Sequence, residues 1–284
     1  RGEGGRGAPP FAAYVDALLA DLDHDLPLAW GRTVQTVFFG GGTPSLFPPE
    51  TIDAFLQQAS ARLRFAPGCE ITLETNPGTA EHGRFEGYRA AGVNRLSFGI
   101  QSFDDGCLQR LGRIHDSREA VAAVKLAQDA GFDNINLDLM FAIPTQTMDN
   151  WLATLNEAMA MQSEHLSSYE VIYEDDTSLY EQLKAGEFSV DEDLACEMYE
   201  ELVSHATKAG FHQYEIANFA RNKTLNSQLS TLNIPSHACQ HNVNYWRGGS
   251  YYGLGPSATG YVRGVRTKNW SNTQLYCEQL EKGN

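Results

Sequence analysis

Positive charge is scarce in this sequence, and so are long apolar runs. The 284 residues include 21 Lys and Arg against 36 Asp and Glu, which gives a net charge of −15. Proteins that bind nucleic acid usually present a basic face, so we expect no nucleic-acid partner. A membrane-spanning helix needs roughly 20 apolar residues in succession, and the best candidate, 11–20, is interrupted by Asp16. We therefore expect no stable insertion into a membrane.

Closely spaced cysteines are also missing. The five cysteines include no C-x-x-C pair and stand at Cys69, Cys107, Cys196, Cys239 and Cys277. Scattered thiols in odd number are typical of a reducing compartment and predict a cytoplasmic location, and by themselves they give no metal-binding signature. The sequence starts at Arg1 with a Gly/Pro/Arg tract over residues 1–10. We expect it to begin inside a longer reading frame.

What the sequence does contain is a repeated junction between helix and strand. An Ala-Gly-apolar phrase occurs at 91–93, 130–132 and 209–211, each time after a helix-like stretch. Glycine fits the left-handed position just past the end of a helix, so each phrase predicts a helix stop. Runs rich in β-formers predict strands at 34–39, 70–75, 95–100, 135–140 and 166–172, and a weaker one at 214–217.

Amphipathic segments alternate with these strands. One helix is predicted over 50–63, and Asp116 with Glu119 forms a plausible capping box for a second over 117–130. A third apolar face carries Trp151, Leu155 and Ala158. Alternating strands and helices predict an α/β fold, either a parallel barrel or a doubly wound sheet. In both architectures function gathers at the C-terminal ends of the strands.

Those strand ends are unusually polar and rich in glycine. Gly41, Gly42 and Thr43 follow the first strand, where the absence of a Cβ lets backbone groups approach a ligand, although a simple tight turn explains the loop equally well. Glu74 ends the second strand and could accept hydrogen bonds from a ligand hydroxyl or amine. Its alternative is a carboxylate that caps a helix or stabilises a loop.

Three more polar residues stand at or after later strand ends. Gln101 and Asp138 could contact a ligand at the rim or bond to a neighbouring loop. Arg113 could pair with a ligand carboxylate through its planar fork, or equally with one of many surface acids. Taken singly, each structural alternative is favoured.

A second candidate region is the segment CQHNVNYW over 239–246. A neutral imidazole or a thiolate beside several aromatic rings suits heme, because His or Cys can ligate the iron while the rings cover the porphyrin. The alternative is an aromatic packing turn, which the residues alone favour.

Taken in order, these motifs resemble one family. The strings GGGTPSLF, LETNPGT, GVNRLSFGIQSF, NINLDLMFAIP and CQHNVNYW resemble the oxygen-independent coproporphyrinogen III oxidase-like family of the radical S-adenosylmethionine (SAM) superfamily. The motif HNVNYW is similar to that of its heme chaperone branch. The resemblance covers about residues 12–284. It implies a partial (βα)₆ barrel of the TIM type with a [4Fe–4S] cluster and SAM across the strand ends.

The resemblance also assigns roles to positions. It implies SAM contacts at Gly41, Gly42, Thr43, Glu74, Gln101, Arg113, Asp138 and, by a looser alignment, Ile172. It implies heme contact at His241, with Cys239 as the runner-up. It also implies three regions: a tract and first helix over 1–33, the partial barrel over 34–215, and an extension with the heme-type motif over 216–284.

Two departures from the family pattern affect these expectations. The cluster motif C-x-x-x-C-x-x-C is absent, so we expect the first strand and the cluster loop to be missing and no metal ligand in this chain. A polar stretch is inserted over 221–236, and the family's C-terminal domain is expected to be missing as well.

Three hypotheses follow. The first is a fragment of a heme chaperone that binds SAM and heme and passes heme to apoproteins. The second is a coproporphyrinogen III oxidase, an enzyme of porphyrin biosynthesis. The third is a non-catalytic remnant, because this chain by itself lacks the cluster cysteines.

Overall fold

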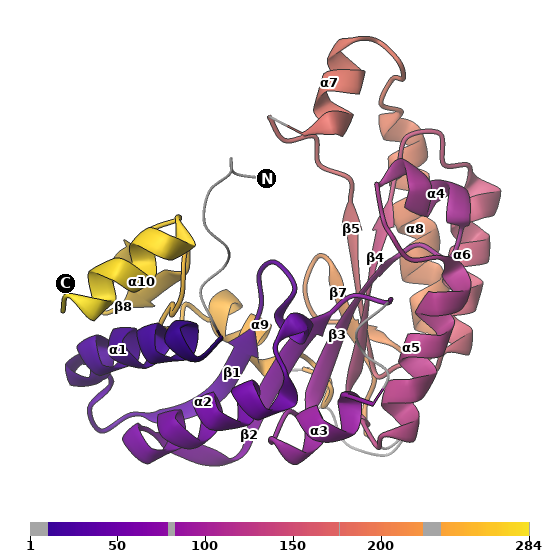
Figure 1. Ribbon diagram of the computed structural model, residues 1–284. Coiled ribbons are helices and arrows are strands. Elements are labelled where there is room, and N and C mark those ends of the chain that lie inside the picture. The colour runs from indigo at the N-terminus through magenta and orange to yellow at the C-terminus, as the bar shows by residue number, and fades with distance from the viewer. Residues whose placement is uncertain (1–10, 79–82, 176, 224–233, 284) are drawn as a thin grey trace.

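A curled sheet with helices on its outer side forms the body of the computed structural model (Figure 1). The structure describes residues 11–78, 83–175, 177–223 and 234–283. The tract over 1–10 and most of the inserted stretch over 221–236 lie outside the described residues. Among the described residues, no helix is both long and apolar enough to cross a membrane.

The sheet has the order β1-β2-β3-β4-β5-β7-β6. Its first five strands are parallel and comprise β1 (Thr33–Phe39), β2 (Arg64–Thr75), β3 (Arg95–Gln101), β4 (Ile135–Phe141) and β5 (His165–Glu170). Two short antiparallel strands, β7 (Asn218–Ala220) and β6 (His212–Gln213), extend it beyond β5. The α/β fold predicted from the strand pattern is confirmed, and of its two alternatives the curled sheet agrees with the partial barrel that the resemblance implies.

At least one helix follows each of the five parallel strands, as the βα pattern requires. The helices are α1 (Phe11–Ala29), α2 (Pro49–Arg62), α3 (Phe85–Ala90), α4 (Asp105–Arg110), α5 (Ser117–Asp129), α6 (Met148–Ala160), α7 (Ser178–Lys184), α8 (Glu192–Lys208), α9 (Gln240–Trp246) and α10 (Thr273–Glu281). A short 3₁₀ turn, η1 (Pro44–Leu46), follows β1, and a hairpin of β8 (Thr259–Val262) and β9 (Val265–Lys268) precedes α10.

Most local expectations are confirmed. The capping box of Asp116 and Glu119 begins α5, and Gly92, Gly131 and Gly210 adopt positive φ just past helix ends. One predicted strand is wrong: residues 214–217 form the turn between β6 and β7, because Tyr214 and Glu215 engage through side-chain hydrogen bonds. The strand predicted over 166–172 ends earlier, at Glu170.

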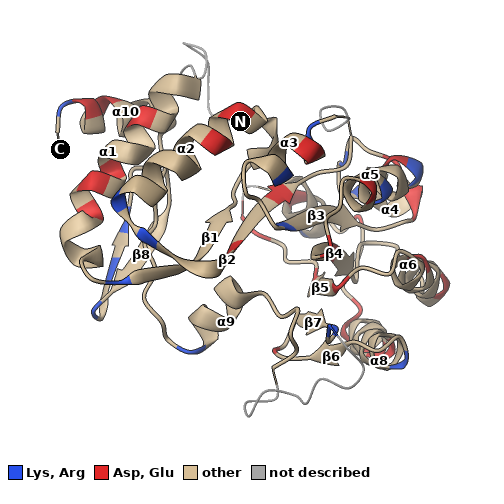
Figure 2. Ribbon diagram, turned by 90° about the horizontal axis from the view of Figure 1, so that it is seen from below, with Lys and Arg blue, Asp and Glu red and all other residues tan. Residues whose placement is uncertain are grey.

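The two faces of the sheet differ in chemistry because side chains alternate along a strand. One face is apolar and fully buried, with Leu73, Leu96, Phe98, Leu137 and Leu139 in the main hydrophobic cluster. Trp151, Leu155 and Ala158 on α6 belong to the same cluster, as predicted. Figure 2 shows α2, α3, α5, α6 and α8 on this outer side of the arc of strands.

The opposite, concave face is polar. Its side chains alternate with the apolar set and include Glu70, Thr72, Arg95, Ser97, Asn136, Asp138, His165 and Ser167, all of them buried except Asp138, which is partly buried. In Figure 2 the short helix α9 lies on this side of the sheet, far in sequence from β1 and β2. Convergent polar groups on a concave surface are typical of a ligand-binding site, so this face is the candidate for one.

Candidate functional site

The loop after β1 carries the first predicted site residues. Gly41 and Gly42 have φ of +80° and +64°, a region that favours glycine. The Gly41 N–H donates to Glu74 Oε2 at 2.9 Å, and Asn76 Nδ2 donates to Thr43 Oγ1 at 3.1 Å. The ends of β1 and β2 are therefore joined through the residues predicted to contact SAM.

Glu74 lies within reach of a second carboxylate. Burial raises its pKa, the Gly41 hydrogen bond lowers it, and the negative charge of Asp138 raises it further. The net direction is upward. A cationic or hydrogen-bond-donating ligand group placed between the two carboxylates would relieve this repulsion.

Asp138 lies on the concave face rather than on a solvent-exposed rim. Ser97 Oγ donates to its Oδ2 at 3.0 Å, and Asn136 Nδ2 donates to its Oδ1 at 2.8 Å. Burial raises its pKa, and these hydrogen bonds with the positive charge of Arg95 oppose the rise. Both oxygens are held in fixed positions, which suits the recognition of ligand hydroxyls.

Gln101 stands where the β3 strand changes register. The pairing of β3 with β4 shifts between Phe98 and Gln101, and Gln101 itself has a φ of +67°. Irregular strand ends re-aim side chains and are common next to active sites. Gln101 is 9% exposed, and its Nε2 lies near the Cα of Gly99, where a Cβ would come within 3.2 Å.

Arg113 does not pair with a surface acid in the described part of the chain, since none of the salt bridges found there includes it. Burial lowers its pKa, and the negative charge of Asp138 opposes that change. Its guanidinium therefore interacts electrostatically with Asp138. No ion pair within the described part of the chain occupies its planar fork, which could bind a ligand carboxylate.

Ile172 stands apart from this group. It lies two residues beyond β5, its side chain is 75% exposed, and it belongs to none of the hydrophobic clusters of the described residues. Its adenine-side role stays a prediction, as do the SAM roles of the other residues.

The second candidate region is α9 with the residue before it. Cys239 is the N-cap and is 5% exposed. Burial raises the pKa of its thiol, so the sulfur stays protonated, and it is a poorer iron ligand than a thiolate.

His241 connects α9 to the edge of the sheet. Its Nδ1 lies 2.9 Å from Thr36 Oγ1 on β1, and its Nε2 lies 2.9 Å from Tyr245 Oη. The ring stacks on Phe38 with 5.0 Å between ring centroids. Burial lowers the pKa of His241 to about 4, and the charge of Arg95 lowers it as well, so the imidazole is neutral near pH 7. A neutral imidazole has one lone pair that can bind a metal, and a metal would replace the hydroxyl, of Thr36 or Tyr245, that donates to that nitrogen.

Aromatic rings continue outward from His241. Tyr245 meets His241 edge-on at 4.9 Å, Tyr251 meets Tyr245 at 4.6 Å, and Tyr261 follows at 6.1 Å. A cavity of about 1010 Å³ lies along β1 and α9 and is lined by His241, Tyr245, Tyr251 and Phe38, among others. Large apolar cavities with a few polar groups are typical ligand sites.

A buried hydrogen-bond network that the sequence analysis missed joins the two regions. Asn136 donates to Asp138 and meets His165 Nδ1 at 2.6 Å, His165 Nε2 lies 2.8 Å from Tyr214 Oη, and the Cys239 N–H donates to that same oxygen at 3.3 Å. The signal in the sequence was the alternation of polar residues along β2 to β5, which marks a polar inner face.

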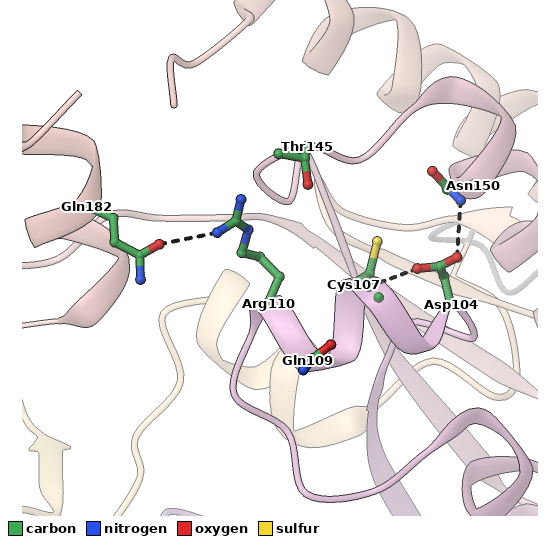
Figure 3. A pocket seen from close by; sticks show the side chains of 8 residues that line it. Asp104, Cys107, Gln109, Arg110, Thr145, Asn150 and Gln182 are labelled. Atoms are coloured by element: carbon green, nitrogen blue, oxygen red, sulfur yellow. Dashed lines mark hydrogen bonds between the residues drawn. The ribbon is translucent and has the colours of Figure 1, made fainter. Parts of the chain in front are cut away.

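Another hollow lies at the strand-end rim, between α4, α7 and the loop before α6 (Figure 3). Its volume is about 520 Å³, and Asp104 in its wall caps α4 and accepts a hydrogen bond from Asn150. Burial raises the pKa of Cys107 to about 12, so it offers a protonated thiol. None of the sequence-predicted site residues lines this hollow.

The side chains at each candidate site determine which cofactors could bind there. Among the described residues, no group of three or more His, Cys, Asp or Glu could hold a metal ion, so the side chains present do not fit a [4Fe–4S] cluster. The strand-end group fits SAM, because it offers a glycine loop, two carboxylates and an arginine. His241 and the aromatic cavity fit heme.

Comparison with known proteins agrees with these motifs. The radical SAM superfamily model matches residues 16–158. The chain is 41% identical to the heme chaperone HemW of Escherichia coli over 90% of this chain and 64% of that protein. It is 32% identical to HemW of Bacillus subtilis over 96% of this chain and 70% of that protein.

A solved structure shares the fold. The structure of coproporphyrinogen III oxidase (HemN) from Escherichia coli matches with a TM-score of 0.79 at 23% identity, over 96% of this chain and 63% of that one. The chain spans less than two thirds of the length of the first relatives it matches. The matched family model and these identities show that the chain belongs to the radical SAM superfamily and, within it, to the HemW family.

Proposed function

We propose that this chain is part of a heme chaperone that binds SAM at the strand ends and heme beside α9. The observation that carries the heme part is the neutral imidazole of His241, held between Thr36 and Tyr245 at the wall of the aromatic cavity. An imidazole is a strong axial ligand of heme iron, and aromatic faces cover a porphyrin well.

The SAM site rests on a separate set of contacts. Glu74 and Asp138 supply carboxylate oxygens, the loop at Gly41 supplies backbone groups, and Arg113 supplies a guanidinium that forms no ion pair among the described residues. SAM carries an amine, a carboxylate, ribose hydroxyls and a sulfonium. Each of these groups has a complementary partner in the set.

Heme-accepting apoproteins would be the partners of such a chaperone, and the cytoplasm its location. The five cysteines are all unpaired in the structure, which is typical of a reducing compartment. We assign no catalytic residue to this chain. The cluster that a radical reaction requires does not fit the described side chains.

The oxidase is the second candidate, and the fold likeness to HemN favours it. The chaperone is preferred because relatives from Escherichia coli and Bacillus subtilis, at 41% and 32% identity, carry that name and because the segment HNVNYW is present.

Heme transfer separates the candidates. The chain is loaded with heme, freed of excess by gel filtration and mixed with apomyoglobin while the Soret band is followed. A chaperone should load about one heme per chain and pass it on. Loading without transfer, or decarboxylation of coproporphyrinogen by a cluster-loaded longer chain, would favour the remnant or the oxidase respectively.

A further inference from the structure

One carboxylate on the concave face holds the start of α9. Glu70 lies on β2, is 8% exposed, and accepts three hydrogen bonds from consecutive residues. The Gln240 N–H donates to Oε2 at 3.1 Å, the His241 N–H donates to Oε1 at 3.1 Å, and Cys239 Sγ donates to Oε1 at 3.6 Å. The first N–H groups of a helix have no partner within the helix, so Glu70 supplies what α9 itself cannot.

A buried cation lies on the neighbouring strand, β3. Arg95 on β3 is 2% exposed and forms no salt bridge within the described part of the chain. Burial lowers the pKa of Arg95, whereas its electrostatic interactions with Cys239, Glu70, Tyr214 and Asp138 raise it, and the net direction is upward. Because burial keeps the Cys239 thiol protonated, the carboxylates of Glu70 and Asp138 are the groups that balance the positive charge of Arg95. A charged acceptor makes shorter and stronger hydrogen bonds than a neutral one.

We propose that Glu70 is a positioning residue that sets the place of the His241 imidazole. This inference rests on the proposed heme site. The Glu70 carboxylate fixes the backbone of His241 at one end of the ring, and Thr36 with Tyr245 fixes the ring nitrogens. Without Glu70, the hydrogen bond from the Cys239 N–H to Tyr214 is the remaining tie of this backbone to the concave face among the described contacts.

The variant Glu70→Gln tests this role, because an amide nitrogen donates hydrogen bonds where a carboxylate oxygen accepts them. Both carboxylate oxygens accept from α9, so an amide nitrogen in place of either one faces an N–H or S–H donor. The variant loses at least one hydrogen bond and the negative charge while keeping nearly the same volume. We expect heme affinity to fall about tenfold or more, the loss typical of one hydrogen bond to a charged group.

Glu164 provides a matched control. It is a partly buried carboxylate of the same sheet region that accepts the Ile135 N–H at 2.9 Å, and it makes no described contact with α9. Glu164→Gln should cost stability of the same kind. It should leave the position of the Soret band and the heme affinity unchanged.

The experiment is a heme titration of the full 284-residue chain, followed by Soret absorbance and by electron paramagnetic resonance of the ferric complex. It compares wild type, Glu70→Gln, Glu164→Gln, His241→Ala and the double variant Glu70→Gln/His241→Ala. If Glu70 acts through His241, the ferric spectrum of Glu70→Gln should shift toward that of His241→Ala. The double variant should bind heme no more weakly than His241→Ala, because neighbouring effects on one contact do not add.

The outcomes separate this inference from the proposed function. Wild type without a heme band overturns both. Wild type that binds heme while Glu70→Gln behaves like Glu164→Gln overturns the positioning role alone, as do additive losses in the double variant. If circular dichroism shows that Glu70→Gln is unfolded, Glu70→Asp decides. It keeps the charge but shortens the reach, and an unchanged spectrum and affinity in that variant contradict the inference.

Discussion

The two faces of the central sheet differ in their side chains: the outer face is apolar and packed against helices, and the concave face is polar and hydrogen-bonded. On the outer face, apolar residues such as Leu96, Phe98 and Leu137 are fully buried against the helices. On the concave face, buried polar residues such as Asn136 and His165 are hydrogen-bonded to one another and to the α9 region. Folding stability therefore depends mostly on the outer face and ligand binding on the concave face. Substitutions on one face should change stability, and substitutions on the other should change ligand affinity.

The largest effect is expected from the outer face. Trp151 on α6 is fully buried, its indole N–H donates to the Met198 carbonyl at 2.7 Å, and its ring contacts Phe141. Trp151→Ala should lower the free energy of unfolding by about 3 to 5 kcal/mol, because it leaves a large cavity. Trp30→Ala is the control, since Trp30 is 88% exposed, and it should change stability by less than about 0.5 kcal/mol. Urea denaturation gives both values, and equal losses would contradict the division.

A concave-face change should do the reverse. Asp138→Asn removes a partly buried charge whose pKa burial raises, and the Ser97 hydroxyl can accept from the new amide nitrogen, so folding stability should change little. SAM affinity should fall about tenfold or more, as expected for a lost charged acceptor. Calorimetric titration with SAM checks this, with the exposed residue change Asp149→Asn as the control. Unchanged affinity in Asp138→Asn would remove this residue from the site.

The sequence predicted the outer face better than the concave one. Runs of β-forming residues and the glycine stops placed all five parallel strands, since those signals lie within each segment. The contact between Thr36 and His241 spans 205 positions, and that between Glu70 and Gln240 spans 170. No local pattern encodes such pairs. The strand expected over 214–217 failed for a related reason, because Tyr214 is held by His165 rather than by strand pairing.

The last effect expected is a change in the pH dependence of stability. The pKa of His241 in the folded chain is about 4, below its ordinary value near 6.5, so the unfolded chain binds this proton first as the pH falls. Stability from this group is therefore fully present above about pH 6.5 and is lost as the pH falls toward 4. In His241→Gln the dependence should be shallower by up to about one proton over that range.

The measurement for this prediction is the slope of unfolding free energy against pH. Asp138 and Glu74 have raised pKa values and act with the opposite sign, so the quantity to compare is the difference between wild type and His241→Gln. Identical slopes would mean that His241 is solvated in the folded chain and is not part of the buried concave-face region.

The central claim is that His241 on the concave side is the heme ligand, and a heme titration of His241→Ala beside Cys239→Ala tests it most directly. The buried thiol of Cys239 stays protonated and its sulfur donates to Glu70, so Cys239→Ala should retain the wild-type Soret position. His241→Ala should lose at least about tenfold in affinity, together with the spectrum of an imidazole-ligated heme. Retention of wild-type affinity and spectrum by His241→Ala would contradict the account.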